Sequence, residues 1–247
     1  VLILSVFRPK EEIALYGYPA SMIELLLILP IYFMNSTLPT LSRAFKDQRE
    51  KIQQIFSLAF NFLYTMALPM TIGGIILARP LMALITNDAF LTGNTTAVYG
   101  ADVAFQILLI PCSIAYLTTL LSFTIIASGN QGKLLKLNAI GVLFNIITNL
   151  ILIPSYGFPA AALTTLLSEL LLFSITLWEC RKYAPLHFDW PTLTKVSLGG
   201  AIMGTFVFLS QNNIPTIPLI GIGGLIYIAS LVPLGVINKE MLAHIKK

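Results

Sequence analysis

The 247-residue sequence contains little charge. Only 11% of its residues are Asp, Glu, Lys or Arg, which is less than half the share found in soluble domains. Hydrophobic residues make up 56% of the chain, and the mean hydropathy is +0.83. This composition excludes an ordinary soluble domain and indicates a chain that lies largely in a membrane.

Histidine and cysteine are also scarce. The only histidines are His187 and His244, and neither has an acidic partner at a spacing typical of metal ligands. The apolar runs contain no Ser–His, Cys–His or paired-carboxylate arrangement, so the sequence predicts no metal site, no cofactor and no enzyme. Cys112 and Cys180 fall near opposite ends of two different apolar runs, which excludes a disulfide between them.

Long apolar runs dominate what is present. They cover residues 20–41, 55–78, 103–127, 134–153, 158–178, 196–209 and 218–237. Most are near the roughly 20 residues that a helix needs to cross the hydrocarbon core. The sequence therefore predicts an all-α, polytopic bundle of about seven complete transmembrane spans.

The basic residues orient these spans. Twelve of the fifteen Lys and Arg residues fall in every second gap between the runs, and three fall in the other gaps. By the positive-inside rule, the first set is cytoplasmic, and so is the C-terminus. Because the cations are spread over four loops, the net charge of +4 indicates orientation and attraction to anionic lipids rather than a nucleic-acid partner.

The first residues suggest an incomplete helix. Residues 1–7 are apolar but reach only about 10 Å, and Arg8 follows them on the predicted outer side. They carry no basic region or cleavage site of a signal peptide. We expect this segment to be the end of one further span, with an N-terminal lobe of the same polypeptide missing from the sequence.

Two acidic residues lie well inside the predicted spans. Glu24 is a few residues from an outer end, from which its carboxylate could reach water, whereas Glu169 lies eleven residues beyond Phe158, about 16 Å deep. A charge at that depth costs about 2.5–3.5 kcal/mol on insertion scales and normally faces a cavity or a polar partner. Glu169 is therefore a candidate cavity residue or, alternatively, a neutral carboxyl that packs against the next helix.

A polar stripe on span 134–153 offers such a partner. Asn138, Asn145 and Asn149 recur at helical spacing, and small residues recur every fourth position on span 158–178. We expect Glu169 to face Asn145 or a polar cavity between these spans. Gln106 and Asn35 are isolated polar residues in other spans, and each is either a cavity residue or a packing contact.

The order of several motifs resembles a known superfamily. The segment NIITNLILIPSYG at 145–157 is followed by FPAAA at 158–162 and TLLSE at 165–169. Further matches are LPTLSR at 38–43, RPLMALI at 79–85 and SGNQGK at 128–133. Together they resemble lipid-linked oligosaccharide flippases, in the superfamily that also includes multidrug exporters and lipid II flippases. Pro159 stands where a second glycine is common in that family.

This resemblance implies a MATE-like fold. Residues 1–178 would form the C-terminal transmembrane lobe, and residues 179–247 a cytoplasmic connection, two additional helices and a tail. The complete protein would reside in the plasma membrane and move a polyprenyl-diphosphate-linked glycan from the inner to the outer leaflet for cell-surface polysaccharide assembly. Its partners would be that glycan lipid, the membrane lipids and the missing lobe.

Two other functions fit parts of the pattern. A cation-coupled multidrug exporter has the same fold, but it should carry coupling acids in its N-terminal lobe. A membrane glycosyltransferase or polymerase should carry catalytic residues in large outer loops, and the predicted outer loops here are short.

Overall fold

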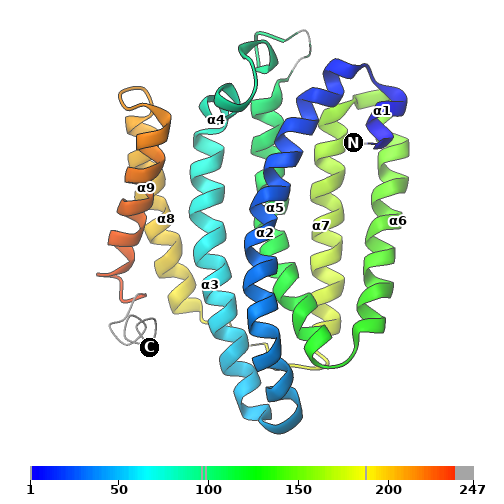
Figure 1. Ribbon diagram of the computed structural model, residues 1–247, viewed down its shortest axis with the longest axis vertical. Helices are drawn as coiled ribbons and strands as arrows, with labels where there is room; N and C mark the ends of the chain where they lie inside the picture. Colours follow the sequence, from blue (N-terminus) through cyan, green and yellow to red (C-terminus); the bar gives the residue numbers. More distant parts are fainter. Residues whose placement is uncertain (1, 96, 98, 187, 237–247) are drawn as a thin grey trace.

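A computed structural model describes residues 2–95, 97, 99–186 and 188–236 (Figure 1). All regular elements in these ranges are helical. They are α1 (Leu2–Phe7), α2 (Lys10–Asp47), α3 (Arg49–Ile76), α4 (Ala78–Ile85), the 3-10 turn η1 (Asp88–Phe90), α5 (Ala101–Ala127), α6 (Gln131–Tyr156), α7 (Phe158–Cys180), α8 (Trp190–Ser210) and α9 (Thr216–Leu231). The predicted all-helical class is confirmed.

Six of the seven predicted spans are helices long and apolar enough to cross a membrane, namely α2, α3, α5, α6, α7 and α8. The seventh, α9, has 16 residues and ends at Leu231, before the predicted end of the span at residue 237. The chain is a multi-pass membrane protein.

Helix α2 begins earlier than the apolar pattern predicts. It has 38 residues and begins at Lys10, before the predicted apolar run that starts at residue 20. Pro9 precedes its first turn, where a missing N–H costs nothing, and Glu11 and Glu12 lie in that turn, where acids favour the positive end of the helix dipole. These charged residues extend the helix although they do not belong to its apolar run.

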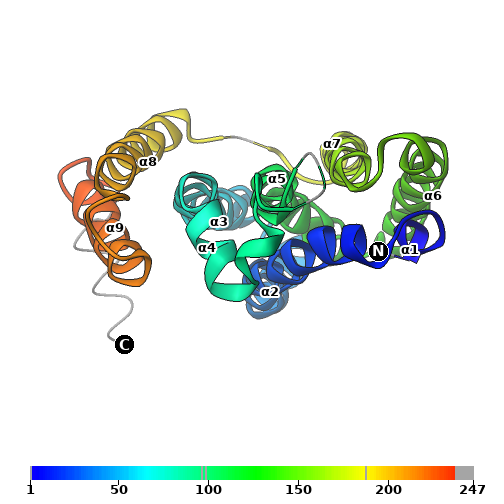
Figure 2. The same ribbon diagram turned by 90° about the horizontal axis from the view of Figure 1, so that it is seen from above.

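Helix α5 lies at the centre of the bundle (Figure 2). It packs against α2, α3 and α7, while α6 packs on the far side of α7. The ring of Tyr116 is fully buried, and its hydroxyl donates to the Leu26 carbonyl of α2 over 2.9 Å. Large apolar side chains such as Leu143 and Ile151 stay exposed on α6, as expected of helices that face lipid.

Helices α8 and α9 form a pair at the other end of the bundle, against α3 (Figure 2). Val196, Met203, Val207 and Tyr227 belong to a small core of their own. The Tyr227 hydroxyl donates to the Thr65 carbonyl of α3 over 2.9 Å, which ties the pair to the bundle. The division of the chain near residue 178 stays a prediction.

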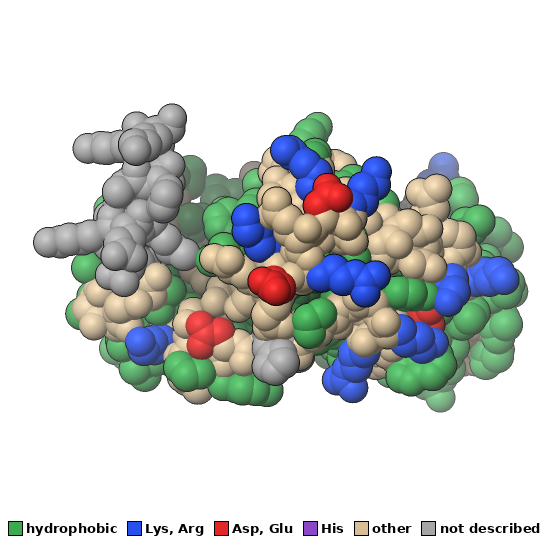
Figure 3. All heavy atoms as spheres, turned by 90° about the horizontal axis from the view of Figure 1, so that it is seen from below, with side chains coloured by type: hydrophobic (Ala, Val, Ile, Leu, Met, Phe, Trp, Pro, Cys, Tyr) green, Lys and Arg blue, Asp and Glu red, His purple; other side chains and the backbone are tan. Residues whose placement is uncertain are grey.

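Basic side chains gather at one end of the molecule (Figure 3). This end holds the α2–α3, α5–α6 and α7–α8 connections, and we call it the basic end. Its described cations are Arg43, Lys46, Arg49, Lys51, Lys133, Lys136, Arg181, Lys182 and Lys195. His187, His244, Lys239, Lys246 and Lys247 lie outside the described residues.

Candidate functional site

A groove runs between α1, α2, α6 and α7, with a volume of about 600 Å³. A second hollow of about 480 Å³ continues along α6 and α7, and both hollows share Asn145 and Thr165. We call the two together the polar groove. Its polar lining residues are Tyr16, Glu24, Asn138, Asn145, Asn149, Thr165, Ser168 and Glu169.

Hydrogen bonds between α6 and α7 form the wall of this groove. The Thr164 hydroxyl donates to Asn149 Oδ1 over 2.7 Å, and Asn145 Nδ2 donates to Ser168 Oγ over 2.9 Å. The amide of Asn149 also donates to the Asn145 carbonyl and side-chain oxygens, over 2.8 and 2.9 Å. The four-residue spacing of the two asparagines and of the two hydroxyl residues lets each pair face the other helix.

Glu169 lines the groove as predicted, but its hydrogen bond goes elsewhere. Thr118 Oγ1 of α5 donates to Glu169 Oε1 over 2.5 Å. Successive residues of a helix point about 100° apart, so Ser168 meets α6 while Glu169 turns towards α5. Sequence reasoning did not identify Thr118, because a threonine inside an apolar helix usually bonds its own backbone.

Helix α2 supplies the opposite wall. The Tyr16 and Thr165 hydroxyls share a hydrogen bond of 3.1 Å, and Glu24 lies two turns further along the same face of α2, exposed in the groove. Tyr16 precedes the apolar run that begins at residue 20, so the apolar pattern alone gives it no place in a site. Its eight-residue spacing from Glu24 is the signal that could have placed both on one face.

Arg8, between α1 and α2, joins these helices to the end of α6. Its guanidinium donates to the carbonyls of Ile153 and Pro154, over 3.2 and 3.0 Å, and pairs with Glu12 at 3.6 Å. These carbonyls end α6, where a cation complements the helix dipole. The tight turn to α7 needs Gly157, whose φ of +64° favours glycine.

The other predicted site residues, Asn138, Asn35 and Gln106, do not share one location. Asn138 is an exposed residue on the lining of the second hollow, and Asn35 is exposed on α2 and lines neither hollow. Gln106 Nε2 donates to the Ile75 carbonyl of α3 over 3.1 Å, so it is a packing contact between α3 and α5. The described residues contain no cluster of three metal-ligating side chains.

A second, almost wholly apolar groove of about 350 Å³ lies on the other side of α2. It is lined by α2, α3, α5 and the α8–α9 pair, through residues such as Met22, Leu26, Met203 and Val207. Gly73, Gly74 and Gly223 also line it, and a Cβ at Gly74 or Gly223 would come within 3 Å of Leu109 or Val207. Helix α2 therefore separates a polar groove from an apolar one.

Comparison with known proteins adds two findings. A family model described as "Lipid II flippase MurJ" matches residues 3–216. A solved structure titled "Lipid II flippase MurJ, inward closed conformation" superposes with a TM-score of 0.72 at 18% sequence identity. The superposition covers 94% of this chain and 48% of that one, so the chain spans about half the length of the solved protein. None of the curated proteins matches the chain.

Proposed function

Because the chain belongs to the family of the lipid II flippase MurJ, we propose that it takes part in moving a polyprenyl-diphosphate-linked glycan across the membrane. Lipid II is the first candidate for that substrate. Family membership places the chain among transporters rather than enzymes. The work of such a transporter is to carry a polar head group across the bilayer while the lipid tail stays in hydrocarbon.

The polar groove carries this proposal. Its side chains offer both hydrogen-bond donors and acceptors at membrane depth, and Glu24 is exposed among them. Exposed polar groups in the hydrocarbon region are costly unless they face a cavity or a partner. A glycan, whose hydroxyl and amide groups both donate and accept hydrogen bonds, suits such a lining.

The apolar groove supplies a second observation. Its lining of Met22, Leu26, Met70, Val207 and Ile220 matches an isoprenoid tail in polarity. Since α2 contributes to both grooves, a lipid-linked glycan could place its head on one side of α2 and its tail on the other.

We further propose that the chain works as one lobe. Alternating access requires two bodies that rock around a shared site, and the chain matches 48% of the solved flippase. An N-terminal lobe of the same polypeptide would face the polar groove. The basic end would lie in the cytoplasm of a plasma-membrane protein, with the C-terminus on the same side.

The family match favours a flippase over the cation-coupled exporter and over a membrane glycosyltransferase. Each of these would give a different result in cells. An exporter would lower drug accumulation without exposing glycan lipid, whereas a glycosyltransferase would lengthen the glycan.

Complementation tests the proposal. The full-length protein is expressed in cells depleted of their lipid II flippase, and outer-leaflet lipid II is measured with an impermeant modifying reagent. The unaltered protein should restore growth and labelling, Glu24→Gln should reduce labelling several-fold, and Glu11→Gln, on an exposed part of α2 outside the groove, should not. No labelling by the unaltered protein at normal membrane expression would refute the proposed function.

A further inference from the structure

A separate pocket opens at the basic end, outside both grooves. It has a volume of about 410 Å³ and lies between the α2–α3 hairpin, the α5–α6 turn and the α7–α8 connection. Its polar lining residues are Lys46, Arg49, Ser128, Asn130, Lys182 and Tyr183. Three of these carry a positive charge, and none is acidic.

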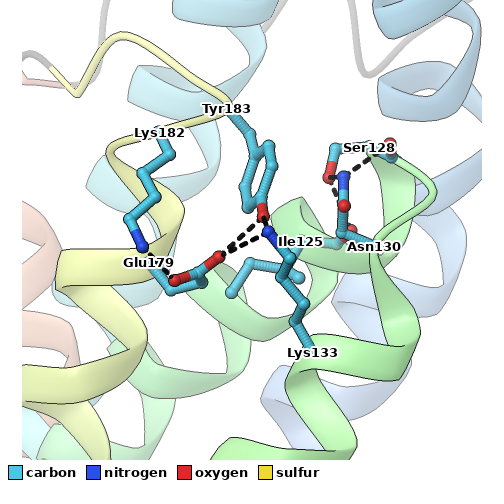
Figure 4. Close-up of polar contacts among 7 residues, drawn as sticks. All are labelled: Ile125, Ser128, Asn130, Lys133, Glu179, Lys182 and Tyr183. Carbon is cyan, nitrogen blue, oxygen red and sulfur yellow. Dashed lines mark hydrogen bonds and ion pairs between the residues drawn. The ribbon is translucent and has the colours of Figure 1, made fainter.

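The charge of the nearest buried acid, Glu179, is already balanced by two lysines. Glu179 accepts hydrogen bonds from Lys182 Nζ and the Tyr183 hydroxyl, each over 2.6 Å, and its other cation is Lys133 Nζ at 3.3 Å (Figure 4). Lys133 also donates to the Tyr183 hydroxyl over 2.6 Å. Since Lys133 and Lys182 bring two positive charges to one carboxylate, Glu179 does not cancel the charge of Lys46 and Arg49.

Two further acids lie nearby on the hairpin. Asp47 and Glu50 are exposed neighbours of Lys46 and Arg49 in sequence, and neither lines the pocket. Figure 3 shows acidic side chains among the basic ones on this face of the molecule. Because neither Asp47 nor Glu50 lines the pocket, its polar lining consists of cations and neutral groups.

The wall opposite the hairpin is held in place by its own hydrogen bonds. The Ser128 hydroxyl donates to the Ile125 carbonyl over 2.7 Å, and the Asn130 amide donates to Ser128 O and Oγ, each over 3.1 Å (Figure 4). Gly129 between them has a φ of +80°, which favours glycine. A wall fixed in this way loses little conformational entropy when a ligand binds.

The position along the membrane normal indicates where a ligand would come from. Trp178 and Trp190 are 65% and 68% exposed, as expected of indoles at a membrane interface. Lys182 follows Trp178 by four residues, and its Nζ lies 3.7 Å from the centroid of the indole. The pocket therefore lies at the level of the lipid head groups.

We propose that this pocket binds a phosphate group at the membrane surface. Arg49 offers a planar guanidinium that can hold two phosphate oxygens, and Lys46 adds a second charge-assisted donor. The phosphate belongs either to an anionic phospholipid head group or to a soluble phosphate from the same side of the membrane. The site is distinct from the polar groove and does not depend on the proposed transport.

Native mass spectrometry of the purified full-length protein tests this site. The probes are phosphatidylglycerol and inorganic pyrophosphate, added to protein in a neutral detergent. The comparison uses whichever probe the unaltered protein binds more tightly. The Lys46→Gln/Arg49→Gln variant should bind that probe at least tenfold more weakly than the unaltered protein does. The matched variant Arg43→Gln/Lys136→Gln removes two exposed cations that do not line the pocket and should change affinity less than threefold.

Competition separates the two sources. Tight binding of phosphatidylglycerol that pyrophosphate does not displace assigns the site to a lipid, and displacement by pyrophosphate assigns it to a soluble phosphate. Equal losses in both double variants would show diffuse surface attraction and overturn the proposal, as would the absence of tight binding by the unaltered protein. The thermal midpoint without probe checks folding. If the pocket variant is unfolded, Arg49→Gln alone replaces it and should weaken binding about threefold against Arg43→Gln.

Discussion

The hydrogen bond between Asn149 and Thr164 provides the sharpest test of the helix packing. Asn149 is 7% exposed, Thr164 is fully buried, and their side chains join α6 to α7 over 2.7 Å. Asn149→Ala removes this bond and the two bonds from the Asn149 amide to the carbonyl oxygen and Oδ1 of Asn145. Thr164→Val removes the hydroxyl and keeps the branched shape. A double-mutant cycle of the two substitutions isolates their interaction.

The expected change in free energy follows from hydrogen bonds measured between helices of membrane proteins, which contribute about 0.6 kcal/mol on average and up to about 1.7 kcal/mol. Asn149→Ala loses three hydrogen bonds, so its free energy of unfolding should fall by about 1.8 kcal/mol, and by up to about 5 kcal/mol if each bond has the largest measured value. The coupling energy of the cycle should lie between about 0.6 and 1.7 kcal/mol, because one shared bond is measured.

Reversible unfolding in mixed micelles measures these values. Thr71→Val is the matched control, since the Thr71 hydroxyl donates to the Ala67 carbonyl of its own helix, α3, and shares no partner with Asn149. Its coupling with Asn149→Ala should be near zero. A coupling between Asn149 and Thr164 no larger than this control would refute the assignment of the pair as a stabilising bond between α6 and α7.

Three further outcomes are expected. A single cysteine at Gln131 should react with an impermeant reagent only from the cytoplasm, and one at Asn213 only from outside; the reverse pattern would invert the proposed orientation. The Thr192 hydroxyl donates to the Asp189 carboxylate, which lowers the pKa of Asp189 below its ordinary 3.8. Asp189→Ala should therefore destabilise the start of α8 by about 0.5–2 kcal/mol at neutral pH, and its difference from the unaltered protein should shrink as the pH falls below about 4, because that contribution is lost on protonation. A difference that persists at acid pH would contradict this role. In the full-length protein, Glu169→Gln keeps an acceptor for the Thr118 hydroxyl and removes the charge; slower transport at normal expression supports a role in the cavity, and unchanged transport supports packing alone.

The helices were largely predictable because hydrocarbon imposes one rule on the whole chain: every backbone group must be bonded inside its own helix. An apolar run of about 20 residues then has few alternatives. The rule fails where the helix leaves the membrane. The charged start of α2 is helical although no apolar pattern marks it, and α9 ends before its apolar run does.

The candidate site was only partly predictable. Asn145 and Asn149 share a face through their spacing along one helix, and the sequence contains that spacing. Thr118 meets Glu169 because α5 packs against α7, and Tyr16 meets Thr165 because α2 closes over them. Such neighbours depend on the order in which helices pack, and no periodicity within a single helix specifies that order.

Comparing polar residues at similar depth shows what separates packing from function. The Gln106 amide donates to the Ile75 carbonyl, which is one of the last carbonyls of α3. Because these carbonyls have no partner within that helix, the Gln106 side chain supplies one where α3 ends and α4 begins. The side-chain amide and oxygen of Asn149 already have hydrogen-bond partners on α6 and α7. Glu24, by contrast, is exposed in a groove whose other wall is already bonded. Because an exposed acid in hydrocarbon is costly, Glu24 is the groove residue for which a partner outside this chain is the simplest physical explanation.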